Sequence, residues 1–225
     1  MNRHYIILIV TLAVLCGSLV TAGATLRERD EQLRGYVDAT QNSDLPYWMP
    51  RLGVNAELTQ YTPDELDQQL DLMRAAHITW VRQFARWDDI EPSRGEFDWA
   101  QWDTIVAAFT DDSDLQLVAV LMNSPTWARE SQPEETNTTP PDDPASFADF
   151  ARAFAERYGT TIDHYQIWDE PNLDDAWGGL DPRPADYAAL LSEAYSAIHG
   201  ADAGAMVIAA ALAPTTEQRG DNISD

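Results

Sequence analysis

The sequence predicts an α/β fold in which parallel strands alternate with helices. From Met49 onward, short apolar runs alternate with amphipathic segments, the pattern of repeated βα units. Two of the runs, residues 115–122 and 205–213, are almost wholly apolar, as buried strands of a parallel sheet are. A (β/α)8 barrel and a doubly wound open sheet both fit. No G-x-G-x-x-G or G-x-x-x-x-G-K-[ST] motif follows a predicted strand, so the usual evidence for a nucleotide-binding open sheet is missing.

The individual elements are predicted from local signals. Strands are expected at residues 51–58, 78–84, 115–122, 162–168 and 205–213. Thr62-Pro63-Asp64-Glu65 combines a capping box with proline at the first helical position, so a helix is expected to start there. Asp143-Pro144 opens another helix, which Gly159 ends. Two more helices are expected at residues 98–109 and 184–199.

The N-terminus has the features of an export signal. Asn2, Arg3 and His4 precede an apolar run over residues 5–20, and Ala22-Gly23-Ala24 matches a cleavage site. Residues 1–24 are therefore expected to be a signal peptide, or an uncleaved membrane anchor. The protein would be secreted, or held at the outer face of the cytoplasmic membrane. Residues 25–48 are expected to form a linker, and residues 49–225 the barrel domain. The only cysteine, Cys16, lies in the signal segment, so the mature chain would have no disulfide.

The charge of the chain restricts its partners. The chain contains 38 acidic and 14 basic residues, all of the latter arginine, and its net charge is −24. Nucleic acid and anionic membrane surfaces are poor partners for such a protein, whereas a neutral polysaccharide is compatible with it. The histidines His77, His164 and His199 have no metal-ligand spacing, so neither a metal nor another cofactor is expected.

Polar and aromatic residues gather where the predicted strands end. Glu170 follows the fourth predicted strand, in a turn that Pro171 and Asn172 make irregular. In a β/α barrel the carboxyl ends of the strands carry the chemistry, so Glu170 is a candidate general acid/base. The other strand ends supply amides, an arginine and tryptophans, the mixture that binds sugar hydroxyls and stacks on sugar rings. The predicted substrate-binding residues are Asn55, Asn123, Trp127, Trp168, Asn172 and Trp177.

Three segments resemble a known family. They are W-V-R-Q-F-A-R-W-D-D-I-E-P-S-R-G-E-F-D-W from Trp80, N-S-P-T-W from Asn123, and I-W-D-E-P-N from Ile167. Over residues 51–214 the chain resembles the N-terminal part of a clan A glycoside hydrolase, in the β-xylosidase/α-L-iduronidase branch of the cellulase-like superfamily. The resemblance implies a (β/α)8 barrel and a retaining mechanism on a β-linked poly- or oligosaccharide. It gives Glu170 the acid/base role and lets Arg82 support the nucleophile.

The sequence departs from this family pattern at Asp169, where the family has asparagine. A carboxylate can only accept a hydrogen bond from a substrate hydroxyl, whereas an amide can also donate one. Two adjacent carboxylates also repel each other, so Asp169 is expected to tune the pKa of Glu170 upward.

The second catalytic carboxylate of the family is also missing. The resemblance places the nucleophile after a seventh strand, and these residues supply only about the first five βα units. Glu57 and Glu217 are the nearest alternatives. The chain is therefore expected to be an N-terminal fragment that is inactive by itself. A non-catalytic carbohydrate-binding or cell-surface barrel is the alternative function, and an unrelated open-sheet protein is a third.

Overall fold

The computed structural model describes residues 3–32, 52–110, 114–131, 136–215 and 222–223. The contacts divide the chain into two compact units, Met1–Pro50 and Arg51–Asp225. In the first unit, helix α1 (Arg3–Gln32) runs without a break through the expected cleavage site after Ala24. Among the helices of the described residues, none combines the length and the apolar character that crossing a membrane requires. The Glu217 alternative lies outside the described residues, as does most of the expected linker.

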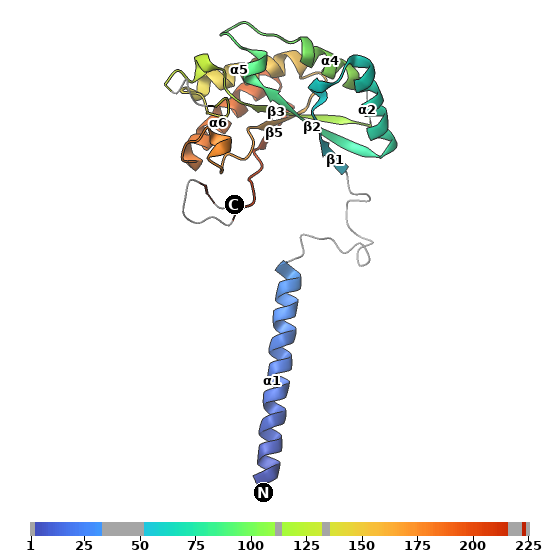
Figure 1. Cartoon of the computed structure of the whole chain (residues 1–225), viewed down its shortest axis with the longest axis vertical. Coiled ribbons are helices and arrows are strands. Elements are labelled where there is room, and N and C mark those ends of the chain that lie inside the picture. Colours follow the sequence, from blue (N-terminus) through green and yellow to red (C-terminus); the bar gives the residue numbers. More distant parts are fainter. Residues whose placement is uncertain (1–2, 33–51, 111–113, 132–135, 216–221, 224–225) are drawn as a thin grey trace. The chain divides into compact units, whose positions relative to one another are not determined.

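The second unit is built on a parallel sheet. Its strands are β1 (Leu52–Asn55), β2 (Ile78–Arg86), β3 (Gln116–Met122), β4 (His164–Ile167) and β5 (Met206–Ala209). They pair in sequence order, β1-β2-β3-β4-β5, and every pairing is parallel (Figure 1). The predicted alternation of parallel strands and helices is confirmed, and the strand order is that of a barrel rather than of a doubly wound sheet. The first strand is shorter than predicted, because a 3₁₀ turn, η1 (Leu58–Gln60), takes up the end of the expected run.

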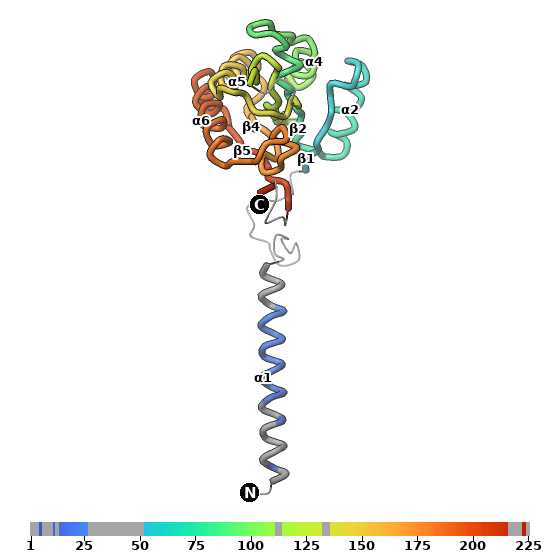
Figure 2. Tube along the Cα trace, turned by 60° about the vertical axis from the view of Figure 1, so that its left-hand side comes forward, coloured from blue at the N-terminus to red at the C-terminus, as the bar shows by residue number. Residues whose placement is uncertain are grey.

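A helix joins each strand to the next. These helices are α2 (Pro63–Ala75), α4 (Ala100–Phe109), α5 (Pro144–Tyr158) and α6 (Pro184–Ala201) (Figure 2). Shorter turns occupy the loops after β2, β3 and β4, namely α3 (Trp87–Ile90), η2 (Thr126–Ala128) and η3 (Asp175–Trp177). Strands and helices alternate in this way in consecutive units of a (β/α)8 barrel, so the fold is a partial barrel of this type.

The helix starts follow the signals in the sequence. At the start of α2, the backbone N–H of Thr62 donates to Glu65 Oε2 at 3.0 Å, and the Thr62 hydroxyl donates to the same oxygen at 2.9 Å. At the start of α5, Asp143 Oδ1 accepts a 3.0 Å bond from the backbone N–H of Ala145. Both helices have proline in the first turn, where a missing N–H costs nothing. These local contacts fix where the βα units begin.

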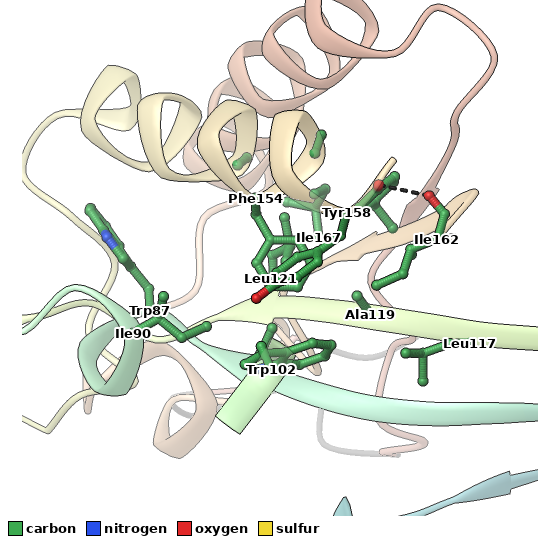
Figure 3. Close-up of a cluster of buried hydrophobic side chains, with 14 of the residues drawn as sticks. Trp87, Ile90, Trp102, Leu117, Ala119, Leu121, Phe154, Tyr158, Ile162 and Ile167 are labelled. Atoms are coloured by element: carbon green, nitrogen blue, oxygen red, sulfur yellow. Dashed lines mark hydrogen bonds between the residues drawn. The ribbon is translucent and has the colours of Figure 1, made fainter. Parts of the chain in front are cut away.

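Large aromatic residues dominate the core between the sheet and the helices. Phe154 of α5 packs edge to face on Trp102 of α4 at 4.8 Å and on Tyr158 at 4.9 Å. Figure 3 shows these side chains gathered beside Leu121 of β3. The β3 residues Ala119 and Leu121 are fully buried there, as the apolar run predicted. The core thus holds the helices on the sheet and fixes the strand ends relative to one another.

Strand β2 shows which residues point away from this core. Val81, Gln83 and Ala85 are buried, and the alternate residues Trp80, Arg82, Phe84 and Arg86 are partly exposed. Successive side chains of a strand point to opposite faces. The two arginines therefore share the sheet face that a barrel turns toward its interior.

Gly178, in the loop after β4, is a position where only glycine fits. Its φ is +75°, and a Cβ there would clash with Thr139 Oγ1 and lie 2.5 Å from Thr139 Cα. Gly178→Ala is expected to lower the free energy of unfolding by about 1–2 kcal/mol through backbone strain and about 1–3 kcal/mol more through overpacking. Urea unfolding measures this loss.

Gly95→Ala is the matched control for this prediction. Gly95 has a φ of +79°, but a Cβ there would meet no atom within 4 Å. The control should show the strain alone, about 1–2 kcal/mol. Equal losses in the two variants would mean that the contact with Thr139 relaxes without cost.

Candidate active site

Arg82 connects three strands at the carboxyl side of the sheet. Its Nη2 donates to Asp169 Oδ1 at 2.6 Å, its Nε to Gln166 Oε1 at 3.0 Å, and its Nη1 to Asn55 Oδ1 at 3.2 Å. The guanidinium also lies 5.0 Å from the centre of the Phe84 ring. The charged groups of Arg82 and Asp169 are both mostly shielded, with 22% and 20% of their side chains exposed. The positive charge of Arg82 is therefore already paired with the Asp169 carboxylate.

The turn after β4 holds Glu170 in an unusual backbone conformation. Trp168 and Glu170 have φ values of +66° and +48°. Such left-handed conformations of non-glycine residues are strained and persist only where neighbours hold them. The N–H of Glu170 donates to Ala211 O at 3.0 Å, and its carbonyl accepts from Leu173 N–H at 3.0 Å. These bonds tie the turn to the segment that follows β5.

The Glu170 side chain is left available. It is partly exposed, and its carboxylate has no hydrogen-bond or ion-pair partner among the described residues. Asp169, next to it, has one oxygen bonded to Arg82. The two adjacent carboxylates thus differ: Asp169 is held in an ion pair, and Glu170 makes no such contact among the described residues.

A second ion pair lies nearby at the ends of β1 and β2. Glu57 Oε2 accepts from Arg86 Nη2 at 2.7 Å, and Glu57 Oε1 accepts from Thr59 at 2.5 Å and from Gln83 at 3.0 Å. Burial raises the pKa of Glu57, but the hydrogen bonds from Arg86, Thr59 and Gln83 outweigh it and lower the pKa to about 2. Glu57 is therefore an ionised partner of Arg86 near the rim, and its role as a nucleophile stays an untested alternative.

This ion pair predicts a pH-dependent stability. The folded pKa of Glu57, about 2, lies below its ordinary value of 4.5, so ionised Glu57 stabilises the fold above that ordinary value. The stabilisation is lost as the pH falls from the ordinary pKa toward the folded one. Because 38% of the Glu57 side chain is exposed, solvent screening limits the contribution to about 1 kcal/mol.

Urea unfolding of the wild type and of Glu57→Gln at neutral and acidic pH checks this prediction. The wild type should lose about 1 kcal/mol more than the variant on acidification to about pH 3. If the free energies of unfolding of the two proteins fell equally on acidification, Glu57 would not be the source of the pH-dependent stability.

Four of the six residues predicted to bind substrate are buried in this structure. Trp168 and Trp177 are 0% and 2% exposed and pack on each other at 5.4 Å. The Asn172 amide is used entirely on backbone, accepting from Ala213 N–H and donating to Ala213 O and Ile223 O. Asn123 is 3% exposed, with a φ of +68° and an Oδ1 that has no hydrogen-bond partner among the described residues. These side chains support the strand ends from beneath, and their role in substrate binding stays a prediction.

Asn55 and Trp127 are the two predicted substrate-binding residues that reach the surface. Asn55 is exposed and orients Arg82. Trp127 is partly exposed and donates from Nε1 to Glu91 O at 3.0 Å, while the Arg94 guanidinium covers its ring at 4.7 Å. It lines a pocket of about 260 Å³ between the loop after β2 and the first turns of α5. Its role as a sugar platform stays a prediction.

Sequence reasoning missed Gln166 of β4. This residue is buried and bonds both Arg82 and Asp169, at 3.0 Å and 3.3 Å. The available signal was an uncharged polar residue inside a strand whose neighbours Tyr165 and Ile167 are core residues. Among the described residues, no group of three or more His, Cys, Asp or Glu side chains is placed to hold a metal.

The fold and the strand-end carboxylates define a class, the barrel enzymes whose chemistry lies at the carboxyl ends of the strands. Residues 57–155 match the family model of glycoside hydrolase family 42, β-galactosidase. The chain has the fold of the cellulase-like, clan A glycoside hydrolases, and its sequence similarity to that family model is confined to residues 57–155. No curated protein matches it.

Solved structures with this fold come from several glycoside hydrolase families. A family 39 glycoside hydrolase from Bacteroides cellulosilyticus WH2 superposes with a TM-score of 0.57 and 19% identity, over 71% of this chain and 31% of that one. A monomeric β-xylosidase from Caulobacter crescentus CB15 gives 0.55 and 21%, over 70% and 35%. GH5_18 from Streptomyces cattleya, in complex with GlcNAc, gives 0.56 and 16%, over 71% and 44%. The chain thus spans less than half of the length of each.

Proposed function

We propose that this chain forms the acid/base part of a retaining glycoside hydrolase that acts on a β-linked poly- or oligosaccharide. The observation that carries the proposal is the Glu170 carboxylate. It has no partner among the residues that the structure describes, and it lies at the carboxyl end of β4, next in sequence to Asp169 of the Arg82–Asp169 ion pair. The likeness to glycoside hydrolases supports the reaction class.

In the proposed reaction Glu170 acts twice. It first donates its proton to the glycosidic oxygen as the bond to the anomeric carbon breaks, and the nucleophile takes the sugar. It then accepts a proton from the water that attacks the anomeric carbon and releases the nucleophile. The nucleophile would be a second carboxylate about 5–5.5 Å away, which we place outside these 225 residues.

The neighbouring residues would fix the sugar and the charges around it. Asp169 gives one oxygen to Arg82, and its other oxygen would accept a hydrogen bond from a sugar hydroxyl. Arg82 would keep a cation beside the incoming nucleophile, and Asn55, which bonds Arg82, would lie along the same wall. These groups are held before substrate arrives, so little reorganisation is needed during the reaction.

Hydrolysis of 4-nitrophenyl β-glycosides by the protein expressed from its complete gene tests the proposal. ¹H NMR of the first-formed sugar should show the β-anomer, since retention preserves the configuration. The α-anomer as first product would exclude a retaining mechanism, and no turnover of any glycoside would exclude a hydrolase. The 225-residue chain alone is expected to bind sugar without turnover.

One observation favours a different function. The Arg82 guanidinium is engaged by Asp169 at 2.6 Å, so its charge is already balanced before any nucleophile approaches. A non-catalytic carbohydrate-binding barrel would tolerate this arrangement. Sugar binding without turnover in the complete gene product would support that alternative.

We further propose that the protein is exported, either secreted or held at the outer face of the cytoplasmic membrane. The apolar N-terminal run and the Ala22-Gly23-Ala24 pattern support this. N-terminal sequencing of the mature protein tests it, because cleavage after Ala24 leaves Thr25 first, and an anchor leaves the segment in place.

A further inference from the structure

Both ends of the Gln166 amide are used within the candidate active site. Gln166 is 6% exposed on β4. Its Oε1 accepts from Arg82 Nε at 3.0 Å, and its Nε2 donates to Trp168 O at 2.8 Å and to Asp169 Oδ1 at 3.3 Å. One side chain therefore contacts the cation, the anion and the strained backbone that precedes Glu170.

We propose that Gln166 is a positioning residue that sets the geometry of the Arg82–Asp169 pair and of the turn presenting Glu170. Its consequence for catalysis rests on the proposed function, whereas its effect on the geometry does not. Gln166 is not expected to touch substrate, and it would act through Arg82 and through the backbone of Trp168.

Three hydrogen bonds fix the orientation of the Arg82 guanidinium. Each of its three nitrogens has a partner from a different place: Gln166 on β4, Asn55 on β1, and Asp169 after β4. An arginine fork held at all three nitrogens has a single orientation, whereas one held by a lone carboxylate can swing about it. Gln166 supplies the bond to Nε, the atom nearest the side-chain stem, and so fixes the plane of the guanidinium.

Gln166 also holds the strained turn after β4. Trp168 has a φ of +66°, and Glu170, two residues on, has a φ of +48°. Strained backbone of this kind needs neighbouring groups that determine it. The Gln166 Nε2 bond to Trp168 O, within the same strand end, is one such contact. Losing it would free the peptide that carries Asp169 and Glu170.

Position 166 needs a side chain that both accepts and donates hydrogen bonds. Arg82 needs an acceptor there, and Trp168 O and Asp169 need a donor. A primary amide supplies both, a carboxylate supplies only the acceptor, and a thioether of similar length supplies neither with useful strength. The variants Gln166→Glu and Gln166→Met therefore separate the two contacts.

The experiment follows the Arg82 Nε–H signal in ¹H–¹⁵N spectra of the full 225-residue chain, assigned by its loss in Arg82→Lys. In Gln166→Met this proton should exchange with solvent about tenfold faster or more, because a hydrogen bond to a charged group is lost. In Gln166→Glu it should stay protected, while the amide signals of Asp169 and Glu170 shift.

Gln83→Met is the matched control. Gln83 is also a buried glutamine with three hydrogen bonds, to Leu58 N–H, Glu57 and Phe84 O, and none of them involves Arg82. Its loss should destabilise the chain and leave the Arg82 exchange rate unchanged. Equal acceleration in Gln83→Met and Gln166→Met would reduce Gln166 to a general stability role and overturn the inference. An unchanged rate in Gln166→Met would overturn it as well.

Two further outcomes keep the test decisive. If Gln166→Met does not fold, Gln166→Glu decides: unshifted Asp169 and Glu170 amides would contradict the proposal. In the complete gene product, Gln166→Glu should lower kcat about tenfold, with KM little changed, since the loss is one of alignment. If the wild type hydrolyses nothing but the Arg82 result holds, the proposed function fails and the positioning role stands.

Discussion

Glu170→Gln in the complete gene product is expected to slow hydrolysis of unactivated β-glycosides by about 10²–10⁴-fold, the contribution of a positioned general acid. Glutamine has nearly the shape of glutamate but cannot donate a proton to the glycosidic oxygen. The Glu170 carboxylate has no protein partner to lose among the described residues. The folding stability and the affinity for sugar should therefore change little.

The dependence on the leaving group makes this prediction specific. A 2,4-dinitrophenolate departs without help from an acid, so the first step of Glu170→Gln on the dinitrophenyl glycoside should be close to the wild-type rate. Unsubstituted phenyl glycosides should show the full loss. Stopped-flow measurement of the released phenol separates this first step from the later attack of water.

Glu156→Gln is the control, since Glu156 is exposed on α5. It should hydrolyse both substrates at the wild-type rate. A uniform loss across leaving groups in Glu170→Gln would assign Glu170 to binding and not to proton transfer. No loss at all would remove it from the mechanism.

Trp168→Ala is expected to lower the free energy of unfolding by about 3–5 kcal/mol, the cost of deleting a large buried aromatic side chain. The Trp168 ring is fully buried, packs on Phe147 at 5.9 Å and on Trp177 at 5.4 Å, and donates from Nε1 to Ala176 O at 3.0 Å. Urea unfolding of the 225-residue chain, followed by circular dichroism, measures the loss.

Trp127→Ala is the comparison, because Trp127 is partly exposed and stands between the Arg94 guanidinium and Trp87. It should cost clearly less than Trp168→Ala, since a smaller area returns to water. If Trp168→Ala left the stability nearly unchanged and instead weakened sugar binding, Trp168 would be a ligand platform and not a core residue.

Much of the fold could be predicted from local signals. The capping box at Thr62 and Glu65 begins α2, and Asp143 begins α5, because these contacts lie within a few residues of each other. The apolar run of β3 predicted a buried parallel strand. The order of the strands came from the structure, because a barrel and a doubly wound sheet both fitted the sequence.

The tryptophans show where pattern reasoning fails at a strand end. Trp168 and Trp177 follow β4, and their position in the chain suggested a sugar-binding rim. The left-handed backbone at Trp168 breaks the alternation of side chains there, and the ring enters the core. No local pattern could show that the Asn172 amide bonds Ala213 and Ile223, because these partners lie 41 and 51 residues away in the chain.

The sequence by itself determined the βα alternation, the helix starts and the position of Glu170 after a strand. Each of these depends on residues close together in the chain. The tertiary structure alone decided the pairing of Arg82 with Asp169, 87 residues apart, and the place of Gln166 between them. It also decided which of the polar and aromatic side chains at the strand ends are accessible. Those outcomes depend on how separate strands meet, and burial at a strand end is set by packing that no local pattern contains.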